Sequence, residues 1–110
     1  MTLRLGGRTL LADAAASKGA PVFVGATDAE IAGYFRQIAG IDVMPAPSMN
    51  ALRQGELIYS FEIVQGEYAG STIILRDYSS SKDLTAARWT IDITGLPAGI
   101  DAKRAEIKFK

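Results

Sequence analysis

The sequence predicts an α+β domain in which an N-terminal helix (or two) packs on one face of a twisted antiparallel sheet of about four strands. The first observation is a stripe of apolar residues at helical spacing between residues 27 and 39. The second is the strict alternation of apolar and polar residues between residues 88 and 94, which is typical of a strand with one buried face. The third is that glycine-rich turns separate strand-like segments, as in antiparallel hairpins. A helix followed by such strands fits a two-layer fold around one core.

The chain divides into an N-terminal extension, residues 1–26, and a single α+β domain, residues 27–110. Within the extension, Arg8–Ser17 is rich in alanine, the residue with the strongest intrinsic preference for helix. We therefore expect the extension either to be partly helical or to be a connector from a longer parent chain. Pro21–Val24 is a short apolar run that can pack on the core or add an edge strand.

The most regular helix is predicted over Thr27–Ala39. Thr27 and Glu30 have the spacing of a capping box, in which each side chain accepts a hydrogen bond from the other residue's backbone amide. Gly40 supplies the C-terminal stop. The apolar residues at helical spacing are Ile31, Tyr34, Phe35 and Ile38. We expect this stripe to face the core rather than to bind a ligand through Tyr34.

Four strands are predicted after a proline-containing connector. Pro45 and Pro47 lack a backbone amide proton, so residues 41–50 are excluded from helix and from a central strand. Alternating apolar residues place the strands at Glu56–Gln65, Ser71–Arg76, Arg88–Thr94 and Arg104–Lys110. The first two strands are expected to form a hairpin, because a glycine-bracketed turn at residues 66–70 joins them.

The composition excludes several kinds of site. The 110 residues are 48% hydrophobic and 22% charged, as in globular domains. The chain has no cysteine and no histidine, which excludes disulfides, thiolate ligands, imidazole bases and histidine zinc sites. We expect no metal and no cofactor, since phosphate-loop and dinucleotide-binding glycine patterns are also missing. No run of about 18 apolar residues is present, so no membrane-spanning segment is expected.

The formal net charge is zero, but the charge is unevenly distributed. Residues 1–75 contain five basic and seven acidic residues, whereas residues 76–110 contain seven basic and five acidic residues. This C-terminal excess is smaller than the basic patch that is common in nucleic-acid-binding domains. A local basic cluster can still act within a neutral protein, so the charge leaves a nucleic-acid partner open.

The residues best suited to chemistry gather in and around the loop that joins the strands Ser71–Arg76 and Arg88–Thr94. Arg76 and Arg88 lie at the inner ends of these strands, on either side of the loop. In one interpretation they form ordinary surface ion pairs, which contribute little, with Asp77, Asp83 or Asp92. In the other, both guanidinium groups converge on a phosphate, whose oxygens suit their planar forks.

The loop itself holds a serine cluster followed by a lysine, Ser79–Lys82. Its hydroxyls, backbone amides and ammonium can together cradle an oxyanion. The same composition is also that of an ordinary turn, so both interpretations stay open.

The strand after the loop has an apolar face and a polar face. Thr90 and Asp92 on the polar face can supply a hydrogen bond and a proton acceptor, although an exposed threonine on a strand needs no function. Trp89 shares the other face with Ile91 and Ile93. We therefore expect Trp89 in the core and not as a platform for stacking a base.

The run IILRDYSSSKDLTAARWTIDI resembles a segment of the C-terminal toxin domains of bacterial polymorphic and contact-dependent growth inhibition systems. In those domains an apolar strand ends in arginine, an aromatic residue and a serine cluster follow, and a Thr-Ile-Asp-Ile strand lies near the end. The upstream helix DAEIAGYFRQIAG, the connector with prolines and the hairpin follow the same order, so the resemblance covers residues 27–110. Such domains belong with barnase, EndoU, colicin nucleases and RelE, which are small α+β folds with a helix packed on an antiparallel sheet.

This resemblance implies a metal-independent ribonuclease toxin, an endoribonuclease that cleaves transfer RNA by attack of the 2′-hydroxyl and leaves a cyclic phosphate. The implied catalytic residues are Arg76, Ser80, Ser81, Lys82, Arg88, Thr90 and Asp92. The implied substrate-binding residues are Tyr78, Ser79, Thr85 and Lys108. The two arginines would hold the phosphate, while Asp92 would be the base and Lys82 the acid.

The resemblance also implies a biological setting. The domain would be the tail of a larger protein that is secreted or delivered into the cytoplasm of a competing bacterium. A cognate immunity protein would bind the domain in the producing cell, and the domain would otherwise be monomeric.

Two other classes of function are compatible with the residues. A non-catalytic protein-binding module, such as an immunity or adaptor domain, would use the open sheet face for a protein partner. The balanced charge argues against the immunity role, because neutralising partners are usually acidic. An enzyme acting on another substrate, such as a nucleotide-modifying effector, has no cofactor motif in the sequence to support it.

Overall fold

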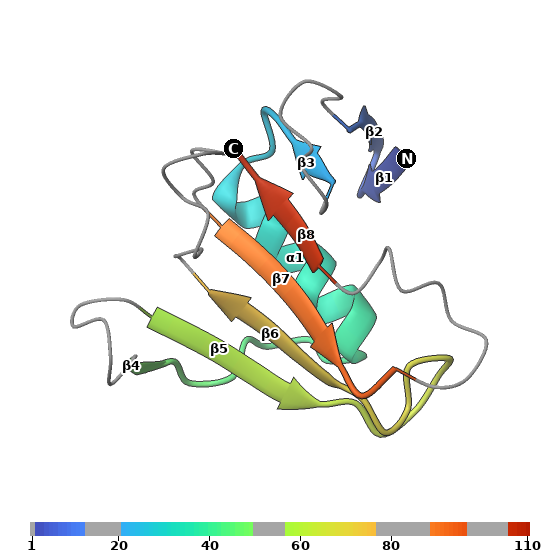
Figure 1. The fold of residues 1–110 in the computed structure, drawn as a ribbon, viewed down its shortest axis with the longest axis vertical. Helices are drawn as coiled ribbons and strands as arrows, with labels where there is room; N and C mark the ends of the chain where they lie inside the picture. Colours follow the sequence, from blue (N-terminus) through green and yellow to red (C-terminus); the bar gives the residue numbers. More distant parts are fainter. Residues whose placement is uncertain (1, 13–20, 50–56, 77–88, 97–105) are drawn as a thin grey trace.

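The computed structural model describes residues 2–12, 21–49, 57–76, 89–96 and 106–110. In these ranges the chain forms one helix, α1 (Asp28–Ala39), and eight strands (Figure 1). The strands are β1 (Thr2–Leu5), β2 (Arg8–Leu11), β3 (Val22–Phe23), β4 (Ser48–Met49), β5 (Leu57–Glu62), β6 (Thr72–Arg76), β7 (Trp89–Thr94) and β8 (Glu106–Phe109). No helix within the described ranges is long and apolar enough to cross a membrane.

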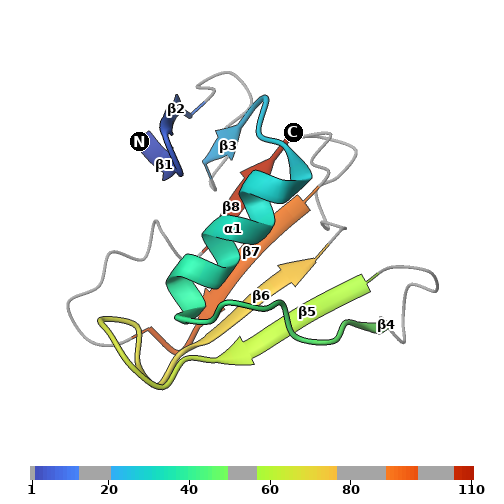
Figure 2. The same ribbon diagram turned by 180° about the vertical axis from the view of Figure 1, so that it is seen from behind.

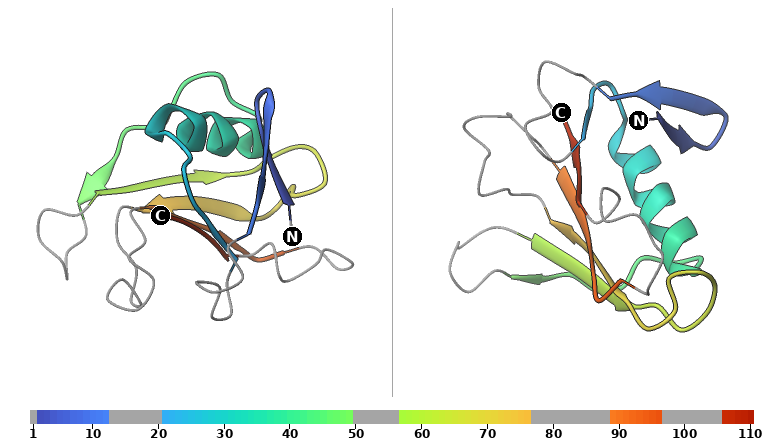
Figure 3. Two further views of the ribbon diagram at one scale, coloured as in Figure 1. Left: turned by 90° about the horizontal axis from the view of Figure 1, so that it is seen from above. Right: turned by 45° about the vertical axis from the view of Figure 1, so that its right-hand side comes forward.

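Six of the strands form one sheet in the order β3-β8-β7-β6-β5-β4. Neighbouring strands are antiparallel except β3 and β8, which are parallel. Helix α1 lies across one face of this sheet, behind it in Figure 1 and in front of it in Figure 2. The view along the sheet in Figure 3 shows the helix and the sheet as two layers. The predicted α+β class, with a helix packed on one face of a mainly antiparallel sheet, is confirmed.

The sheet has six strands where about four were predicted. The four predicted strands are the central ones, β5 to β8, and a two-residue strand is added at each edge. One added strand, β3, lies in the segment Pro21–Val24 that was expected to pack on the core or to form an edge strand. The other, β4, lies in the proline-containing connector and occupies the opposite edge, where such a segment is tolerated. Strands this short are defined by their pairing and leave no periodic signal.

Helix α1 begins and ends at the predicted residues. The Glu30 amide donates to the Thr27 hydroxyl at 3.1 Å, and the Thr27 amide donates to the Glu30 carboxylate at 3.0 Å, which completes the capping box. Gly40 follows the helix with φ of 74°, a left-handed conformation that glycine adopts without steric cost. The predicted apolar stripe faces the core, with Ile31 and Phe35 buried and Tyr34 and Ile38 half-buried against them.

The first residues form a hairpin, β1 and β2, where a partly helical segment or a connector was expected. Leu5 lies opposite Arg8, so Gly6 and Gly7 make a two-residue turn. Gly6 has φ of 58° and Gly7 has no positive φ, which is the pattern of a type II′ hairpin turn, with glycine at its first central position. Leu3, like Leu5, is buried in the main core, so the hairpin covers part of it.

Of the two alternatives for the extension, the helical one is therefore wrong for Arg8–Leu11, and residues 13–17 of the segment Arg8–Ser17 lie outside the described residues. The alanine content of that segment favours helix locally. Burial of Leu3 and Leu5 against the core outweighs this preference, because tertiary packing contributes more than intrinsic propensity.

An ion pair joins the hairpin to the start of the helix. The Arg8 guanidinium donates from Nε and Nη2 to the two carboxylate oxygens of Glu30 at 2.8 and 2.7 Å, and from Nη2 to the Gly25 carbonyl at 2.9 Å. The bond from Arg8, with a further bond from the Thr27 amide, lowers the pKa of Glu30 to about 2. Glu30 thus serves both the cap of α1 and the attachment of β2.

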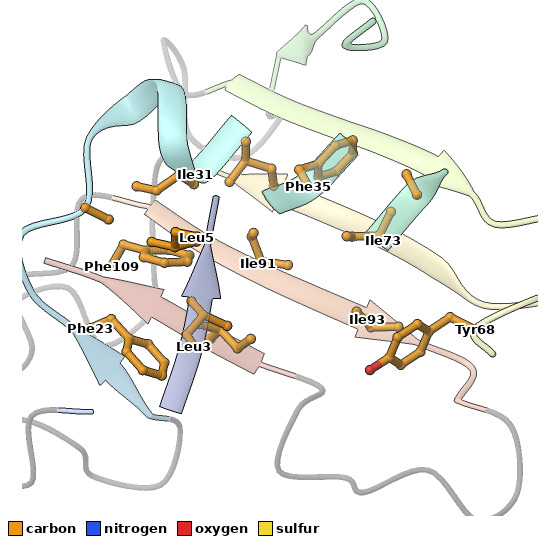
Figure 4. Packing of buried hydrophobic residues seen from close by; sticks show 14 of the residues in the cluster. Leu3, Leu5, Phe23, Ile31, Phe35, Tyr68, Ile73, Ile91, Ile93 and Phe109 are labelled. Atoms are coloured by element: carbon orange, nitrogen blue, oxygen red, sulfur yellow. The ribbon is translucent and has the colours of Figure 1, made fainter. Parts of the chain in front are cut away.

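The core lies between α1, the hairpin and the helix-facing side of the sheet (Figure 4). Ile31 and Phe35 of the helix point toward Ile73, Ile91 and Ile93 of the sheet. Closer to the hairpin, the rings of Phe23 and Phe109 lie with their centroids 6.3 Å apart. The core residues of the strands therefore occupy one side of the sheet, and the polar residues that alternate with them lie on the other side.

Candidate functional site

The sheet face that points away from α1 carries the candidate site. On β6, β7 and β8 the core residues alternate with residues that must point the other way, because side chains on a strand alternate between faces. The core-facing set is Ile73, Leu75, Ile91, Ile93, Ile107 and Phe109. We call the opposite side of the sheet the polar face.

The strand register brings five charged or hydroxyl-bearing residues together on this face. Arg76 lies opposite Thr90, and Thr90 lies opposite Lys108, so these three form one row across β6, β7 and β8. In the adjacent row Asp92 lies opposite Glu106. We call these five residues the polar cluster; three of them belong to the catalytic set predicted from the sequence.

Arg76 is the centre of the polar cluster. Its Nε donates to Asp92 Oδ2 at 2.6 Å and its Nη2 approaches Asp92 Oδ1 at 3.4 Å. The same Nη2 donates to Glu106 Oε2 at 3.2 Å. Of the alternatives left open by the sequence, Arg76 thus has the ion pair with Asp92, and it has a second carboxylate that the sequence did not suggest.

The two carboxylates are held differently. Asp92 uses both oxygens on Arg76 and its side chain is 20% exposed, whereas Glu106 uses one oxygen and is 41% exposed. A carboxylate with an oxygen turned to solvent can approach a bound substrate without first breaking its ion pair. Glu106 is therefore better placed than Asp92 to exchange a proton.

Thr90 and Lys108 are buried, although both were expected on an exposed polar surface. The burial of Thr90 has a physical consequence. Its hydroxyl oxygen has no hydrogen-bond partner among the described residues. Of the buried side-chain nitrogen and oxygen atoms in these residues, it is the one without a partner. An unsatisfied buried hydroxyl costs about 1–3 kcal/mol, so such groups in native proteins call for an explanation.

Seven of the predicted site residues lie outside the described residues: Tyr78, Ser79, Ser80, Ser81, Lys82, Thr85 and Arg88. The same holds for Asp77 and Asp83, the other proposed partners of the arginines. In the sequence, the segment that contains them joins Arg76, the last residue of β6, to Trp89, the first residue of β7. These two strand ends are adjacent, because Arg76 lies opposite Thr90.

Glu106 is the member of the cluster that sequence reasoning missed. The alternation of residues 104–110 places it correctly on the outward face of the last strand. Its proximity to Arg76 depends on the pairing of Asp92 with Glu106, and alternation alone cannot determine a register between strands.

Trp89 packs against the core from the helix-facing side, as predicted. Its indole Nε1 donates to Asp28 Oδ1 at 3.0 Å, which ties the first residue of α1 to the first residue of β7. The indole therefore does not belong to the polar face, even though it precedes Thr90 in the chain.

The polar cluster has the groups needed to bind and transform an anion. A guanidinium and an ammonium lie in one row with a hydroxyl between them, and a carboxylate that is partly open to solvent lies beside them. Within the described ranges, no group of three or more His, Cys, Asp or Glu side chains is arranged to hold a metal ion. The chemistry available to these side chains is hydrogen bonding, charge stabilisation and proton transfer.

Comparison with protein families, with curated proteins and with solved structures finds no match to this chain. The class that the fold and the site define is thus an α+β domain with a helix on one sheet face and a charged cluster on the other.

Proposed function

We propose that this protein is a metal-independent ribonuclease whose active site is the polar cluster. The observation that carries the proposal is the row Arg76, Thr90 and Lys108 with Glu106 beside it, in which a buried hydroxyl has no partner among the described residues. A phosphate seated on this row would accept a hydrogen bond from Thr90 and would be balanced by the two cations.

RNA brings its own nucleophile to such a site. The 2′-hydroxyl loses its proton and attacks the adjacent phosphorus, the bond from phosphorus to the 5′-oxygen breaks, and that oxygen takes up a proton. The products are a 2′,3′-cyclic phosphate and a free 5′-hydroxyl. The protein must orient the strand, accept the first proton, stabilise the charge that develops on the phosphorane and supply the second proton.

The described residues suit two of these tasks, stabilising the charge and accepting the first proton. Arg76 and Lys108 stabilise the charge on the phosphorane, and Thr90 donates a hydrogen bond to one of its oxygens. Glu106 accepts the proton of the 2′-hydroxyl, in place of Asp92, because Asp92 is occupied on both oxygens by Arg76. Asp92 then positions the Arg76 guanidinium. Lys82 as the proton donor stays a prediction, as do Ser80, Ser81 and Arg88.

The resemblance to toxin domains supports the finer part of the proposal. In this view the substrate is transfer RNA, and Tyr78, Ser79 and Thr85 contact it. The domain acts in a competing bacterium after delivery as the tail of a larger protein, and a cognate immunity protein blocks the polar face in the producing cell.

The test is incubation of the purified domain with total bacterial RNA in the presence of EDTA, followed by a denaturing gel and analysis of the fragment ends. We expect discrete transfer-RNA fragments with cyclic phosphate ends. Glu106→Gln should lower the cleavage rate by about 10²–10⁴-fold, the usual contribution of a general base. Glu62→Gln is the matched control, since Glu62 is exposed on the same sheet face but lies on β5, opposite Thr72 and at the far end of the strand from Arg76.

Intact RNA at high protein concentration would contradict the proposal and would favour a binding module that uses the polar face for a protein partner. Cleavage that Glu106→Gln and Glu62→Gln leave equally fast would place the activity elsewhere on the molecule.

A further inference from the structure

A cavity lies on the helix-facing side of the sheet, between the start of α1 and strands β5, β6 and β7. Its volume is about 230 Å³. The described residues that line it are Asp28, Ile31, Ala32, Met44, Tyr59, Leu75 and Trp89. None of the residues of the polar cluster is among them, so this cavity is separate from the proposed nuclease site.

The lining is layered from the core outward. Ile31 and Leu75 are buried and form an apolar floor. Tyr59 and Trp89 are half-buried and supply aromatic walls. Asp28 is exposed and places a carboxylate at the rim. Most small-molecule sites share this design, with apolar and aromatic walls and a few polar groups that fix the orientation of the ligand.

The indole wall is held in place before any ligand arrives. The hydrogen bond from Trp89 Nε1 to Asp28 Oδ1, at 3.0 Å, fixes the ring between the helix and the sheet. Met44 adds an adaptable wall, because its unbranched side chain conforms to different shapes. A wall that is already ordered reduces the entropy lost on binding.

The volume sets the size of the occupant. A dry cavity of about 150 Å³ is enough for benzene, whereas pockets for drug-sized ligands begin at about 300 Å³. A cavity of about 230 Å³ therefore fits one flat ring system, single or fused, and excludes a whole nucleotide.

The charge at the rim selects among such rings. Among the described lining residues, Asp28 is the one that carries a charge, and it is negative. An anionic ring would be repelled by this carboxylate, and a cationic substituent would be attracted to it. A protonated alkylamine attached to such a ring is also attracted by the face of the indole.

We propose that this cavity binds a flat aromatic ring, neutral or bearing an amine, independently of the ribonuclease function proposed above. The ring inserts against Ile31 and Leu75, stacks on Trp89 or Tyr59, and directs its polar or cationic substituent toward Asp28. Both the base of a nucleoside and a free alkylamine that carries an aromatic ring have this chemistry.

The sole tryptophan of the chain provides the readout. In a ¹H–¹⁵N correlation spectrum the Trp89 indole gives a single side-chain N–H signal, which reports directly on the wall of the cavity. We would titrate the intact 110-residue protein with indole, tryptamine and indole-3-acetate, which share one ring and differ in charge. Saturable shifts are expected in the order tryptamine, then indole, then indole-3-acetate, with half-saturation for tryptamine on the order of 1 mM or below.

Two variants and a control sharpen the test. Ala32→Leu fills the cavity from a half-buried helix position and should abolish the saturable shift with tryptamine. Ala29→Leu places the same side chain on the exposed surface of α1 and should leave the shift unchanged. Asp28→Asn retains an oxygen that can accept the indole N–H and should remove the difference between tryptamine and indole-3-acetate.

The proposal is overturned if none of the three indoles gives a saturable shift, or if Ala32→Leu binds tryptamine as well as Ala29→Leu does. Equal affinity of the wild type for tryptamine and indole-3-acetate would overturn the role given to Asp28. Titration with adenosine beside tryptamine distinguishes the two sources. If adenosine saturates at the lower concentration, the better occupant is a nucleoside base; if tryptamine does, it is a free amine. Either result supports the site. Loss of RNA cleavage has no bearing on these outcomes.

Discussion

Arg8 and Arg76 each hold one carboxylate with the same two nitrogens, but in two different surroundings. Arg8 reaches the two oxygens of Glu30 at 2.8 and 2.7 Å, and Arg76 reaches those of Asp92 at 2.6 and 3.4 Å. The Arg8 side chain is 49% exposed, whereas that of Arg76 is 14% exposed. The first pair lies between the hairpin and the helix, and the second lies on the polar face of the sheet.

The Arg8 pair is fully committed to structure. Its second nitrogen also bonds the Gly25 carbonyl, and Glu30 also accepts the Thr27 amide of the capping box. Each of these bonds joins two parts of the fold. Since the pair is largely in solvent, water and salt screen it, and it contributes modestly to stability.

The Arg76 guanidinium is shared between two carboxylates, those of Asp92 and Glu106. One of its nitrogens divides between Asp92 and Glu106, and the neighbouring Thr90 hydroxyl has no partner among the described residues. Partial burial strengthens the attraction between these charged groups, because the local dielectric constant is lower than that of water. The first arginine thus joins parts of the fold, whereas the second belongs to the cluster that we propose as the active site.

The largest expected effect is a loss of RNA cleavage when Arg76 is substituted, but not when Arg8 is. Arg76→Lys keeps the positive charge but loses the planar fork, so it cannot serve Asp92 and a phosphate together. We expect the rate of RNA cleavage to fall by about 10²–10³-fold, the usual loss when one group that stabilises the transition-state charge is removed. Arg8→Lys, the same substitution in the structural pair, should leave the rate unchanged.

Both variants need a thermal unfolding curve beside the rate. If Arg8→Lys slows cleavage as much as Arg76→Lys does, the loss reflects stability in general, and the functional assignment of the polar cluster is wrong.

The same comparison shows what the sequence could predict. The cap of α1 was predictable because Thr27 and Glu30 are three residues apart, and local spacing decides their contact. The pair of Arg76 with Asp92 was among the alternatives, because both lie on strands whose outward faces could be read from alternation. Contacts within one element or between adjacent strands of one hairpin leave such signals.

The contacts that sequence reasoning missed depend on pairing between distant segments. Glu106 reaches Arg76 only because β8 pairs with β7 in one particular register. Arg8 reaches Glu30 only because the first residues fold as a hairpin, against the helix preference of the alanines that follow them. The burial of Thr90 was unpredictable for a similar reason, since exposure of a strand face depends on everything that packs around it.

A smaller effect is expected at Thr90, with opposite signs for stability and activity. Thr90→Val replaces the buried hydroxyl by a methyl group of similar size, so the unsatisfied group disappears. We expect the free energy of unfolding in urea to rise by about 1 kcal/mol. We expect the cleavage rate to fall about tenfold, because a hydrogen bond to the charged phosphate, of about 1.5 kcal/mol, is lost.

Thr94→Val on the same strand is the control, since Thr94 is exposed at the far end of β7 and its hydroxyl contacts the Thr72 carbonyl. It should change neither quantity by a comparable amount. A Thr90→Val protein that is less stable than the wild type would show that the hydroxyl has a structural partner, and it would remove the main support for a phosphate at this position.

The smallest effect belongs to the structural pair and appears only in acid. The pKa of Glu30 is lowered to about 2 in the folded protein, chiefly by the hydrogen bond from Arg8, whereas its ordinary value is 4.5. A carboxyl with a lowered pKa stabilises the fold while it is ionised, so its contribution is complete above about pH 5 and is lost as the pH falls from 4.5 toward 2. Glu30→Gln cannot ionise, so the stability difference between wild type and variant should be largest near pH 6 and narrow toward pH 2.5.

Urea unfolding at several pH values measures this difference, and Arg8→Gln tests its cause. Because Arg8 is the main reason for the low pKa, Glu30→Gln made in the Arg8→Gln background should show a weaker dependence on pH, as a double-mutant cycle would detect. A difference that stays constant between pH 6 and pH 2.5 would mean that the ion pair contributes nothing to the attachment of the hairpin. RNA cleavage at neutral pH should be the same in all three variants, which would confine the Arg8 pair to the fold and leave catalysis to the Arg76 pair.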